Sequence, residues 1–166
     1  LNKDFLEDLF KNKDAINDFY SEVPLDDFPY PDWGSYSKQY PLRNNFFSVN
    51  EKIAIPLLGT RGCPYSCFFY CTYPLQQGRK VRARSVKNII EEIKYWQKEL
   101  GANKFVFRDP VFSINRKHTI EFCNEVISQK LNISFMVETH LNNLDDEMIN
   151  LLKTAGLELV YVGVES

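Results

Sequence analysis

Three of the four cysteines in the 166-residue chain, Cys63, Cys67 and Cys71, lie within one short segment, whereas Cys123 stands alone. Thiols spaced this closely are typical of metal sites rather than of a disulfide framework. Their spacing leaves three alternatives open, which are an iron–sulfur cluster, a zinc ion and buried thiols without a ligand. Structural zinc usually takes four protein ligands, and the nearest fourth candidates, Cys123 and His118, lie far along the chain. Three thiolates without a local fourth favour a [4Fe–4S] cluster, because one iron then keeps an open coordination position.

The segment that carries the three cysteines is predicted to be a loop. Their spacing would also fit one face of a helix, but Gly62, Pro64 and Pro74 make a loop the better interpretation. Cys123 falls on the apolar face of a predicted helix, so we expect it in the core. His140 follows a predicted strand, and we expect it to be a structural histidine rather than a substrate contact.

Strand and helix patterns alternate from residue 51 onward and must position this loop. The predicted strands are Ile53–Leu58, Lys104–Arg108, Ile133–Glu138 and Leu157–Val164. The predicted helices are Val86–Leu100, Arg116–Lys130 and Asp146–Ala155. Buried strands joined by amphipathic helices pair in parallel with right-handed crossovers. The chain is therefore predicted to be α/β, with an open sheet or a TIM-type barrel.

Capping residues mark the ends of two of these helices. Ser85 is predicted to cap the first helix and Gly101 to end it, while Asp145 caps the third and Gly156 ends it. The cysteines lie in an inserted loop, Gly59–Arg84, that follows the first strand. Because ligands gather at the carboxyl ends of parallel strands, this loop is placed where such a fold does chemistry.

The first 50 residues differ in kind from the rest. Residues 3–20 are predicted to form an amphipathic helix. Residues 21–50 are predicted to be a linker, because their prolines interrupt every possible helix or strand. This linker is rich in aromatic residues, so we expect an arm that lies against another surface. The basic run Arg79–Arg84 is interpreted as a solvated approach to the first helix.

Composition limits the partners and the compartment. The formal net charge of −2 supplies no strong field for a nucleic-acid backbone or an anionic membrane. The sequence has no apolar run long enough to span a membrane and no signal-peptide pattern at its start, so a cytoplasmic protein is predicted. Because the chain begins at Leu1 and stops after an apolar run, we expect a fragment. The open sheet edge of such a fragment is expected to favour self-association.

Four segments carry a resemblance to the radical S-adenosylmethionine (SAM) enzymes, most closely to the branch with an N-terminal cobalamin-binding domain. They are Arg61-Gly62-Cys63-Pro64-Tyr65-Ser66-Cys67, Arg82-Ala83-Arg84-Ser85, Phe107-Arg108-Asp109-Pro110-Val111-Phe112 and Gly163-Val164-Glu165-Ser166. The resemblance implies a partial TIM-type (βα) barrel over residues 51–166, comprising its first four parallel strands with three helices. Residues 1–50 would be the helix and linker arm that precede it.

One spacing departs from the family pattern. The usual motif is Cys-x3-Cys-x2-Cys, whereas three residues separate Cys67 from Cys71 here. Either Cys71 still binds the cluster after a one-residue bulge, or the third ligand is missing. We prefer the bulge, because Tyr70 supplies the aromatic residue that the family places before its last cysteine.

The resemblance also implies a mechanism and its cofactors. Cys63, Cys67 and Cys71 would hold a [4Fe–4S] cluster whose open iron binds SAM, and reductive cleavage would give a 5′-deoxyadenosyl radical. The remaining SAM contacts would be Asp109 for the methionine amino group, Glu138, Glu165 and Ser166 for the methionine or ribose portion, and Tyr70 for adenine.

Partners follow from the same resemblance. A reductant such as ferredoxin or flavodoxin would supply the electron, and cobalamin would enter only through a domain outside this chain. The substrate cannot be read from the sequence. The alternative is a non-catalytic barrel that binds zinc or no metal and acts as an interaction domain.

Overall fold

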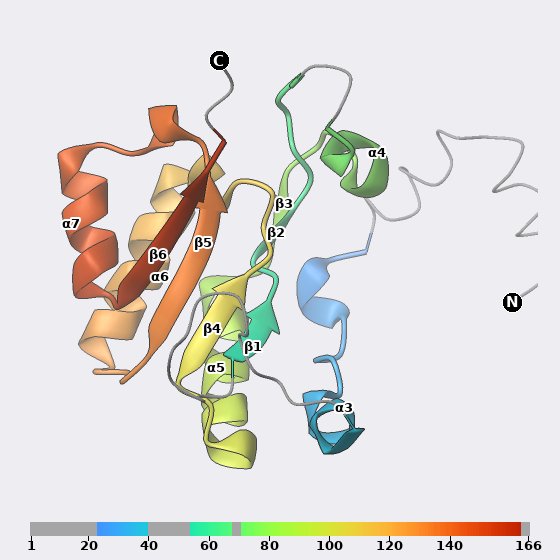
Figure 1. Cartoon of the computed structure of the whole chain (residues 1–166), viewed down its shortest axis with the longest axis vertical. Helices are drawn as coiled ribbons and strands as arrows, with labels where there is room; N and C mark the ends of the chain where they lie inside the picture. The colour runs from blue at the N-terminus through green and yellow to red at the C-terminus, as the bar shows by residue number, and fades with distance from the viewer. Residues whose placement is uncertain (1–22, 40–53, 68–70, 164–166) are drawn as a thin grey trace, which may run out of the picture.

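The structure, a computed structural model, describes residues 23–39, 54–67 and 71–163. Its centre is a four-stranded parallel sheet in the order β1-β4-β5-β6 (Figure 1). The strands are β1 (Ala54–Leu57), β4 (Lys104–Phe107), β5 (Ser134–Thr139) and β6 (Leu157–Val162). All four predicted strands are confirmed, with ends that differ by one or two residues.

Three helices cover one face of this sheet and follow the predicted pattern. They are α5 (Val86–Leu100), α6 (Arg116–Ser128) and α7 (Asp146–Thr154), and the short 3-10 helices η2 (Phe112–Ile114) and η3 (Leu141–Asn143) precede the last two. Among the described residues, none of the helices is both long enough and apolar enough to cross a membrane. The expected α/β architecture, with helices between parallel strands, is therefore present.

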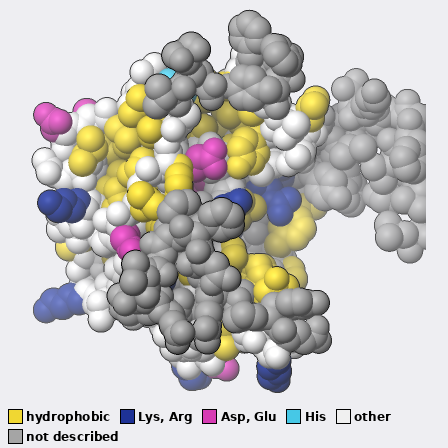
Figure 2. All heavy atoms as spheres, viewed as in Figure 1, with side chains coloured by type: hydrophobic (Ala, Val, Ile, Leu, Met, Phe, Trp, Pro, Cys, Tyr) yellow, Lys and Arg dark blue, Asp and Glu magenta, His cyan; other side chains and the backbone are white. Residues whose placement is uncertain are grey.

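The core lies between the sheet and these helices. Phe105 and Phe107 of β4, Phe135 of β5 and Phe122 of α6 are fully buried, and Phe107, Phe122 and Phe135 pack edge to face. Side chains alternate across a strand, so Val106, between the two phenylalanines of β4, points to the other face of the sheet. Where it is visible, that other face is largely hydrophobic, with acidic and basic side chains near its middle (Figure 2).

The predicted helix caps are confirmed by their hydrogen bonds. The Ser85 hydroxyl accepts from the Asn88 amide at 3.1 Å, and the Asp145 carboxylate accepts from the Met148 amide at 2.8 Å. Gly101 ends α5 in the left-handed conformation with φ 62°. Capping of this kind satisfies amide and carbonyl groups that a helix end leaves unpaired.

Gly156 joins α7 to β6 at a point where only glycine fits. Its φ is +108°, and a Cβ atom there would lie 2.4 Å from the Ile133 carbonyl oxygen. Gly156→Ala is expected to lower the free energy of unfolding by about 2 to 5 kcal/mol, from backbone strain and overpacking together. Gly101→Ala is the matched control, since its φ is +62° and nothing lies within 4 Å, and it should cost about 1 to 2 kcal/mol. Urea unfolding measures both, and equal losses would contradict this account.

The arm before the sheet contains a helix that the sequence analysis did not predict. A 3-10 helix, η1 (Leu25–Asp27), is followed by α3 (Trp33–Gln39), so the prediction that proline interrupts every element was wrong here. Pro31 lies before the helix rather than inside it, and the Asp32 carboxylate accepts from the Ser35 amide at 2.9 Å. The helix predicted over residues 3–20 lies outside the described residues.

The described part of the arm lies against the edge of the sheet and α5. The Tyr30 hydroxyl donates to the Asn88 carbonyl at 3.4 Å, and the Ser85 amide donates to the Asp26 carboxylate at 2.8 Å. Tyr30 and Trp33 also pack on the core. The expectation that this aromatic segment lies on another surface is confirmed for these residues.

Candidate active site at the carboxyl ends of the strands

The long connection between β1 and α5 returns on itself and carries the cysteines. Its two ends pair as the short antiparallel strands β2 (Thr60–Arg61) and β3 (Arg82–Ala83), and α4 (Tyr73–Gln77) lies between them. Residues 62–67 have no regular structure, which confirms the predicted loop there. The loop therefore rises from the carboxyl end of β1, as Figure 1 shows.

The cysteine loop and the carboxyl end of β5 enclose a cavity of about 350 Å³. Cys63, Cys67 and Cys71 all line it. The cavity is also lined by Tyr65, Tyr73, Glu138 and His140. Its volume lies within the range of small-molecule sites in proteins. The structure thus brings the three predicted metal ligands and Glu138 together around one space.

The three thiols differ in exposure but influence one another. Cys63 is buried, Cys71 is half-buried and Cys67 is exposed. Burial raises the pKa of the Cys63 thiol, and the neighbouring Cys67 and Cys71 raise it further. Bound metal favours the thiolate form of such ligands. In the described part of the chain, no three His, Cys, Asp or Glu side chains converge closely enough to hold a single ion. Three thiols are the donor set that the family resemblance assigns to a [4Fe–4S] cluster.

Backbone hydrogen bonds hold the first cysteine in place. The Cys63 amide donates to the Gly78 carbonyl at 3.0 Å, and the Gly62 amide donates to the Gln77 side-chain oxygen at 3.2 Å. Gly62 has φ +95° and packs directly on the Lys80 carbonyl. The returning half of the loop therefore fixes the start of the cysteine motif.

Tyr65 connects the cysteine motif to the end of β5. Its ring stacks on His140 with centroids 5.0 Å apart, and its hydroxyl donates to the Asn143 side-chain oxygen at 3.3 Å. His140 accepts from the Asn142 amide at 3.2 Å through Nδ1. These contacts hold His140 in place, and its side chain also lines the cavity.

Glu138, the last residue but one of β5, places its carboxylate at the wall of the cavity. The Tyr73 hydroxyl donates to Glu138 Oε2 at 3.4 Å. Burial raises the pKa of Tyr73, and the negative charge of Glu138 raises it further. Tyr73 was missed by the sequence analysis. Its position two residues after Cys71 was the only signal that could have pointed to it.

Asp109, which the family resemblance assigns to the methionine amino group, lies after β4. It does not line the cavity, and its carboxylate is fully buried under the β1–β2 turn. Oδ1 accepts from the Gly59 amide at 2.7 Å, and Oδ2 accepts from the Thr60 hydroxyl at 2.8 Å. Because the protein itself satisfies both oxygens, Asp109 positions the start of the cysteine loop in this structure.

Asp109 also gives the fold a pH dependence. Burial raises its pKa from 3.8 to about 6, although the hydrogen bonds from Gly59 and Thr60 favour the charged form. The folded protein therefore holds this proton more tightly than the unfolded chain does. The contribution of Asp109 to the free energy of unfolding is fully present below about pH 4. It falls as the pH rises to about 6 and stays level above that.

Asp109→Asn keeps the shape of the side chain but cannot titrate. We expect this substitution to remove the fall in stability that Asp109 causes. The slope of the free energy of unfolding against pH, between about pH 4 and 6, should therefore differ between the variant and the parent. Urea unfolding across this range measures the slopes. Asp146→Asn, which also replaces one carboxylate but at an exposed position, is the matched comparison. Parallel curves for Asp109→Asn and the parent would contradict the assignment.

Three predicted SAM contacts, Tyr70, Glu165 and Ser166, lie outside the described residues. Cys123 is in the core as expected, with 0% exposure, and burial raises its pKa to about 12.

The interpretation of the basic run Arg79–Arg84 as solvated was wrong for Arg84, which is largely buried and paired with Glu92 of α5. The sequence analysis had no signal for this pair, since Glu92 looked like one more polar residue of a helix.

Comparison with known proteins matches residues 57–166 to the Radical SAM superfamily. The chain is 32% identical over 110 residues to an uncharacterized methyltransferase of Pyrococcus horikoshii, covering 66% of this chain and 24% of that protein. It is 30% identical over 150 residues to the anaerobic magnesium-protoporphyrin IX monomethyl ester cyclase of Rubrivivax gelatinosus, covering 88% of this chain and 26% of that protein. The chain thus spans about a quarter of the length of these relatives.

A solved structure shares the fold. It is the radical S-adenosylmethionine methyltransferase TsrM from Kitasatospora setae, determined with cobalamin and a [4Fe–4S] cluster bound. The TM-score is 0.64 at 20% identity, over 69% of this chain and 23% of the TsrM chain. The predicted fold class, the first strands of a TIM-type barrel, is therefore confirmed.

Proposed function

The chain belongs to the radical SAM superfamily, and from this premise we propose that it forms the cluster-binding part of an enzyme that cleaves SAM reductively. The observation that carries the proposal is the cavity lined by Cys63, Cys67, Cys71 and Glu138. A set of three cysteines on one cavity suits a cluster that keeps one iron open.

The residues that carry the proposal have defined tasks. The three cysteines hold the cluster, and Tyr65 keeps the cysteine motif against the residues that follow β5. Glu138, oriented by Tyr73, accepts hydrogen bonds from the methionine or ribose portion of SAM. When bound, the reduced cluster supplies one electron that cleaves SAM to methionine and a 5′-deoxyadenosyl radical.

The contacts beyond this cavity are proposed on the family resemblance. Tyr70 is assigned to the adenine, and Glu165 with Ser166 is assigned to the ribose or methionine portion. Asp109 supports the cysteine loop rather than touching SAM, because both of its oxygens are already bound within the protein.

The wider reaction is proposed from the relatives. They are named as methyltransferases and a cyclase, and the TsrM structure contains cobalamin. We propose a related reaction on a substrate still to be identified, with cobalamin supplied by a domain outside this chain. A ferredoxin- or flavodoxin-type reductant would deliver the electron, in a cytoplasm that keeps the thiols reduced.

Anaerobic reconstitution with iron and sulfide, followed by dithionite and SAM, tests the proposal. The expected product is 5′-deoxyadenosine, measured by liquid chromatography and mass spectrometry, and it should be absent with Cys67→Ala. Stoichiometric zinc after purification, with neither iron uptake nor SAM cleavage after reconstitution, would support the non-catalytic alternative and overturn the proposal.

A further inference from the structure

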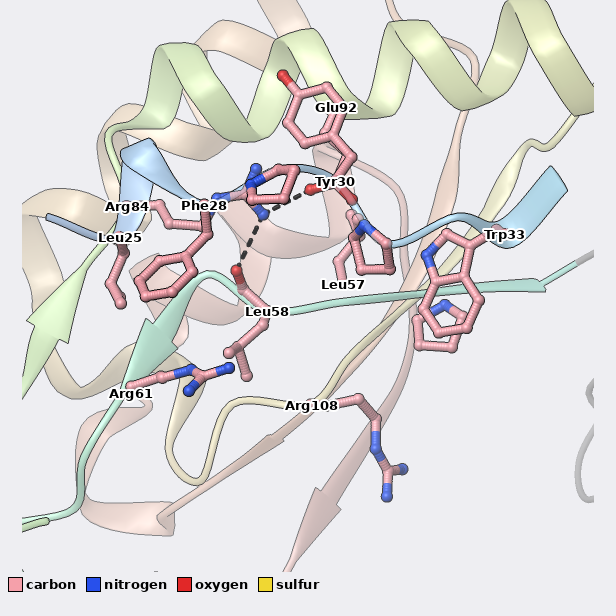
Figure 3. A pocket seen from close by; sticks show the side chains of 13 residues that line it. Leu25, Phe28, Tyr30, Trp33, Leu57, Leu58, Arg61, Arg84, Glu92 and Arg108 are labelled. Atoms are coloured by element: carbon pink, nitrogen blue, oxygen red, sulfur yellow. Dashed lines mark hydrogen bonds and ion pairs between the residues drawn. The ribbon is translucent and has the colours of Figure 1, made fainter. Parts of the chain in front are cut away.

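A second cavity, of about 190 Å³, lies between the arm and the edge of the sheet (Figure 3). Its apolar wall is built by the arm and by β1 with the residue that follows it. This apolar wall includes Leu25, Phe28, Trp33, Pro56, Leu57 and Leu58. Neither the proposed cluster nor the proposed SAM contacts use any of them. The cavity therefore needs a separate explanation.

The polar groups that line this cavity divide into one internal pair and a set of free donors. Arg84 pairs with Glu92 and donates to the Leu58 carbonyl at 3.1 Å, as the dashed lines in Figure 3 show. Arg61 and Arg108 have no ion pair with any described residue. Trp33 Nε1 is buried and has no acceptor among the described residues. The groups left over are all donors, which suits a ligand that brings acceptors.

Arg61 also stands directly opposite another arginine. Arg61 of β2 and Arg82 of β3 are cross-strand partners in the short ladder, and like charges in that position destabilise a sheet. Burial lowers the pKa of Arg82, and the charge of Arg61 lowers it further. Within the described chain neither arginine has an acidic partner. An anion bound here would relieve this repulsion.

Arg108 lines the second cavity and lies close enough to the candidate active site to act on Tyr73. Arg108 follows β4 directly, and the Val106–Met136 pairing of β4 with β5 brings it level with Glu138. The charges of Glu138 and Arg108 both act on the Tyr73 hydroxyl, with opposite effects on its pKa. In Figure 3, Arg61 and Arg108 lie on one side of β1 and Arg84 on the other. A ligand held by Arg61 and Arg108 would therefore lie beside the cluster cavity.

We propose that this cavity binds the oxyanion of a small apolar acid, a carboxylate or a phosphate ester, between Arg61 and Arg108. The ligand is the substrate of the enzyme, an assignment that rests on the proposed function. Guanidinium groups suit these oxyanions because they present paired donors in a plane. The apolar wall, with the Trp33 ring at one end, accommodates the body of the acid.

Equilibrium dialysis of the full chain against three naphthalene probes tests the site. The probes are 2-naphthoate, 2-naphthyl phosphate and the neutral 2-naphthalenemethanol. The acids should bind at least about tenfold more tightly than the alcohol, and Arg61→Gln or Arg108→Gln should each weaken acid binding about tenfold. Lys94→Gln, which removes an exposed charge from α5, is the matched control and should change nothing.

Stability gives a readout that a merely structural arginine would not give. Arg61→Gln removes the repulsion from Arg82, so its unfolding midpoint without ligand should equal or exceed that of the parent. Equal binding of acid and alcohol, or acid binding unchanged in both arginine variants, would overturn the site. Displacement of 2-naphthoate by SAM would show that SAM itself occupies the site and would overturn the substrate assignment. None of these measurements needs the cluster, so this proposal can fail while SAM cleavage is observed, or the reverse.

Discussion

Replacing Cys63, Cys67 or Cys71 with alanine is expected to reduce the iron bound after anaerobic reconstitution from about four atoms per chain to less than about one. The three thiols line one cavity, and no other cysteine of the described chain lies there. Loss of one thiolate from a set of three leaves two irons without a protein ligand. Iron and sulfide analysis, with the visible absorbance of the cluster, measures the effect.

The fourth cysteine provides the matched control. Cys123 is in the core with 0% exposure and does not line the cavity. Cys123→Ala should keep the full iron content and lower the free energy of unfolding by about 1 to 3 kcal/mol. If Cys71→Ala also kept its iron, the longer spacing between Cys67 and Cys71 would mean that the third ligand is another group.

Gly62→Ala is expected to abolish most cluster binding although every thiol remains. A Cβ atom at residue 62 would lie 2.1 Å from the Lys80 carbonyl oxygen and 2.8 Å from its carbon, and φ there is +95°. The two halves of the loop must therefore separate, which breaks the Cys63–Gly78 hydrogen bond and displaces the first ligand. We expect iron content to fall at least about fivefold and unfolding free energy to fall by about 2 to 5 kcal/mol.

Gly101→Ala separates this steric effect from the general cost of removing a left-handed glycine. Residue 101 has φ +62° but open space around its Cβ position, and it lies at the far end of α5. Its iron content should equal that of the parent. Far-ultraviolet circular dichroism checks that the Gly62 variant keeps its helices and sheet. A Gly62→Ala protein that takes up the full cluster would show that the loop does not need this close approach.

The alternation of strands and helices could be predicted because burial imposes a period on the sequence. Ser85 and Asp145 could be placed as caps because a short polar side chain before an apolar pattern satisfies the free amides of a helix. The helix Trp33–Gln39 was missed because the prolines of residues 21–50 indicate interruptions, although Pro24, Pro29 and Pro31 all precede this helix. Local sequence rules therefore predicted the four-stranded sheet and its helices but not the arm.

The site could be predicted only in part, because the cysteine loop folds back on itself. Asp109 lies shortly after β4 and Glu138 lies near the end of β5. The sequence therefore predicts the same place, the carboxyl edge of the sheet, for both. Only the returning β2–β3 ladder shows that Asp109 is covered by Gly59 and Thr60 while Glu138 stays at the cavity. The Arg84–Glu92 pair depends on the same long-range contact. These positions depend on tertiary contacts, which leave no periodic pattern in the sequence.

Electron paramagnetic resonance of the reduced, reconstituted protein tests the central claim most directly. If Cys63, Cys67 and Cys71 hold a [4Fe–4S] cluster with one iron open, the spectrum should be that of a reduced cubane cluster. Addition of SAM should shift its g values, because SAM binds the open iron. A cluster spectrum that SAM leaves unchanged, or no cluster signal from the parent chain after iron and sulfide reconstitution, would contradict the account.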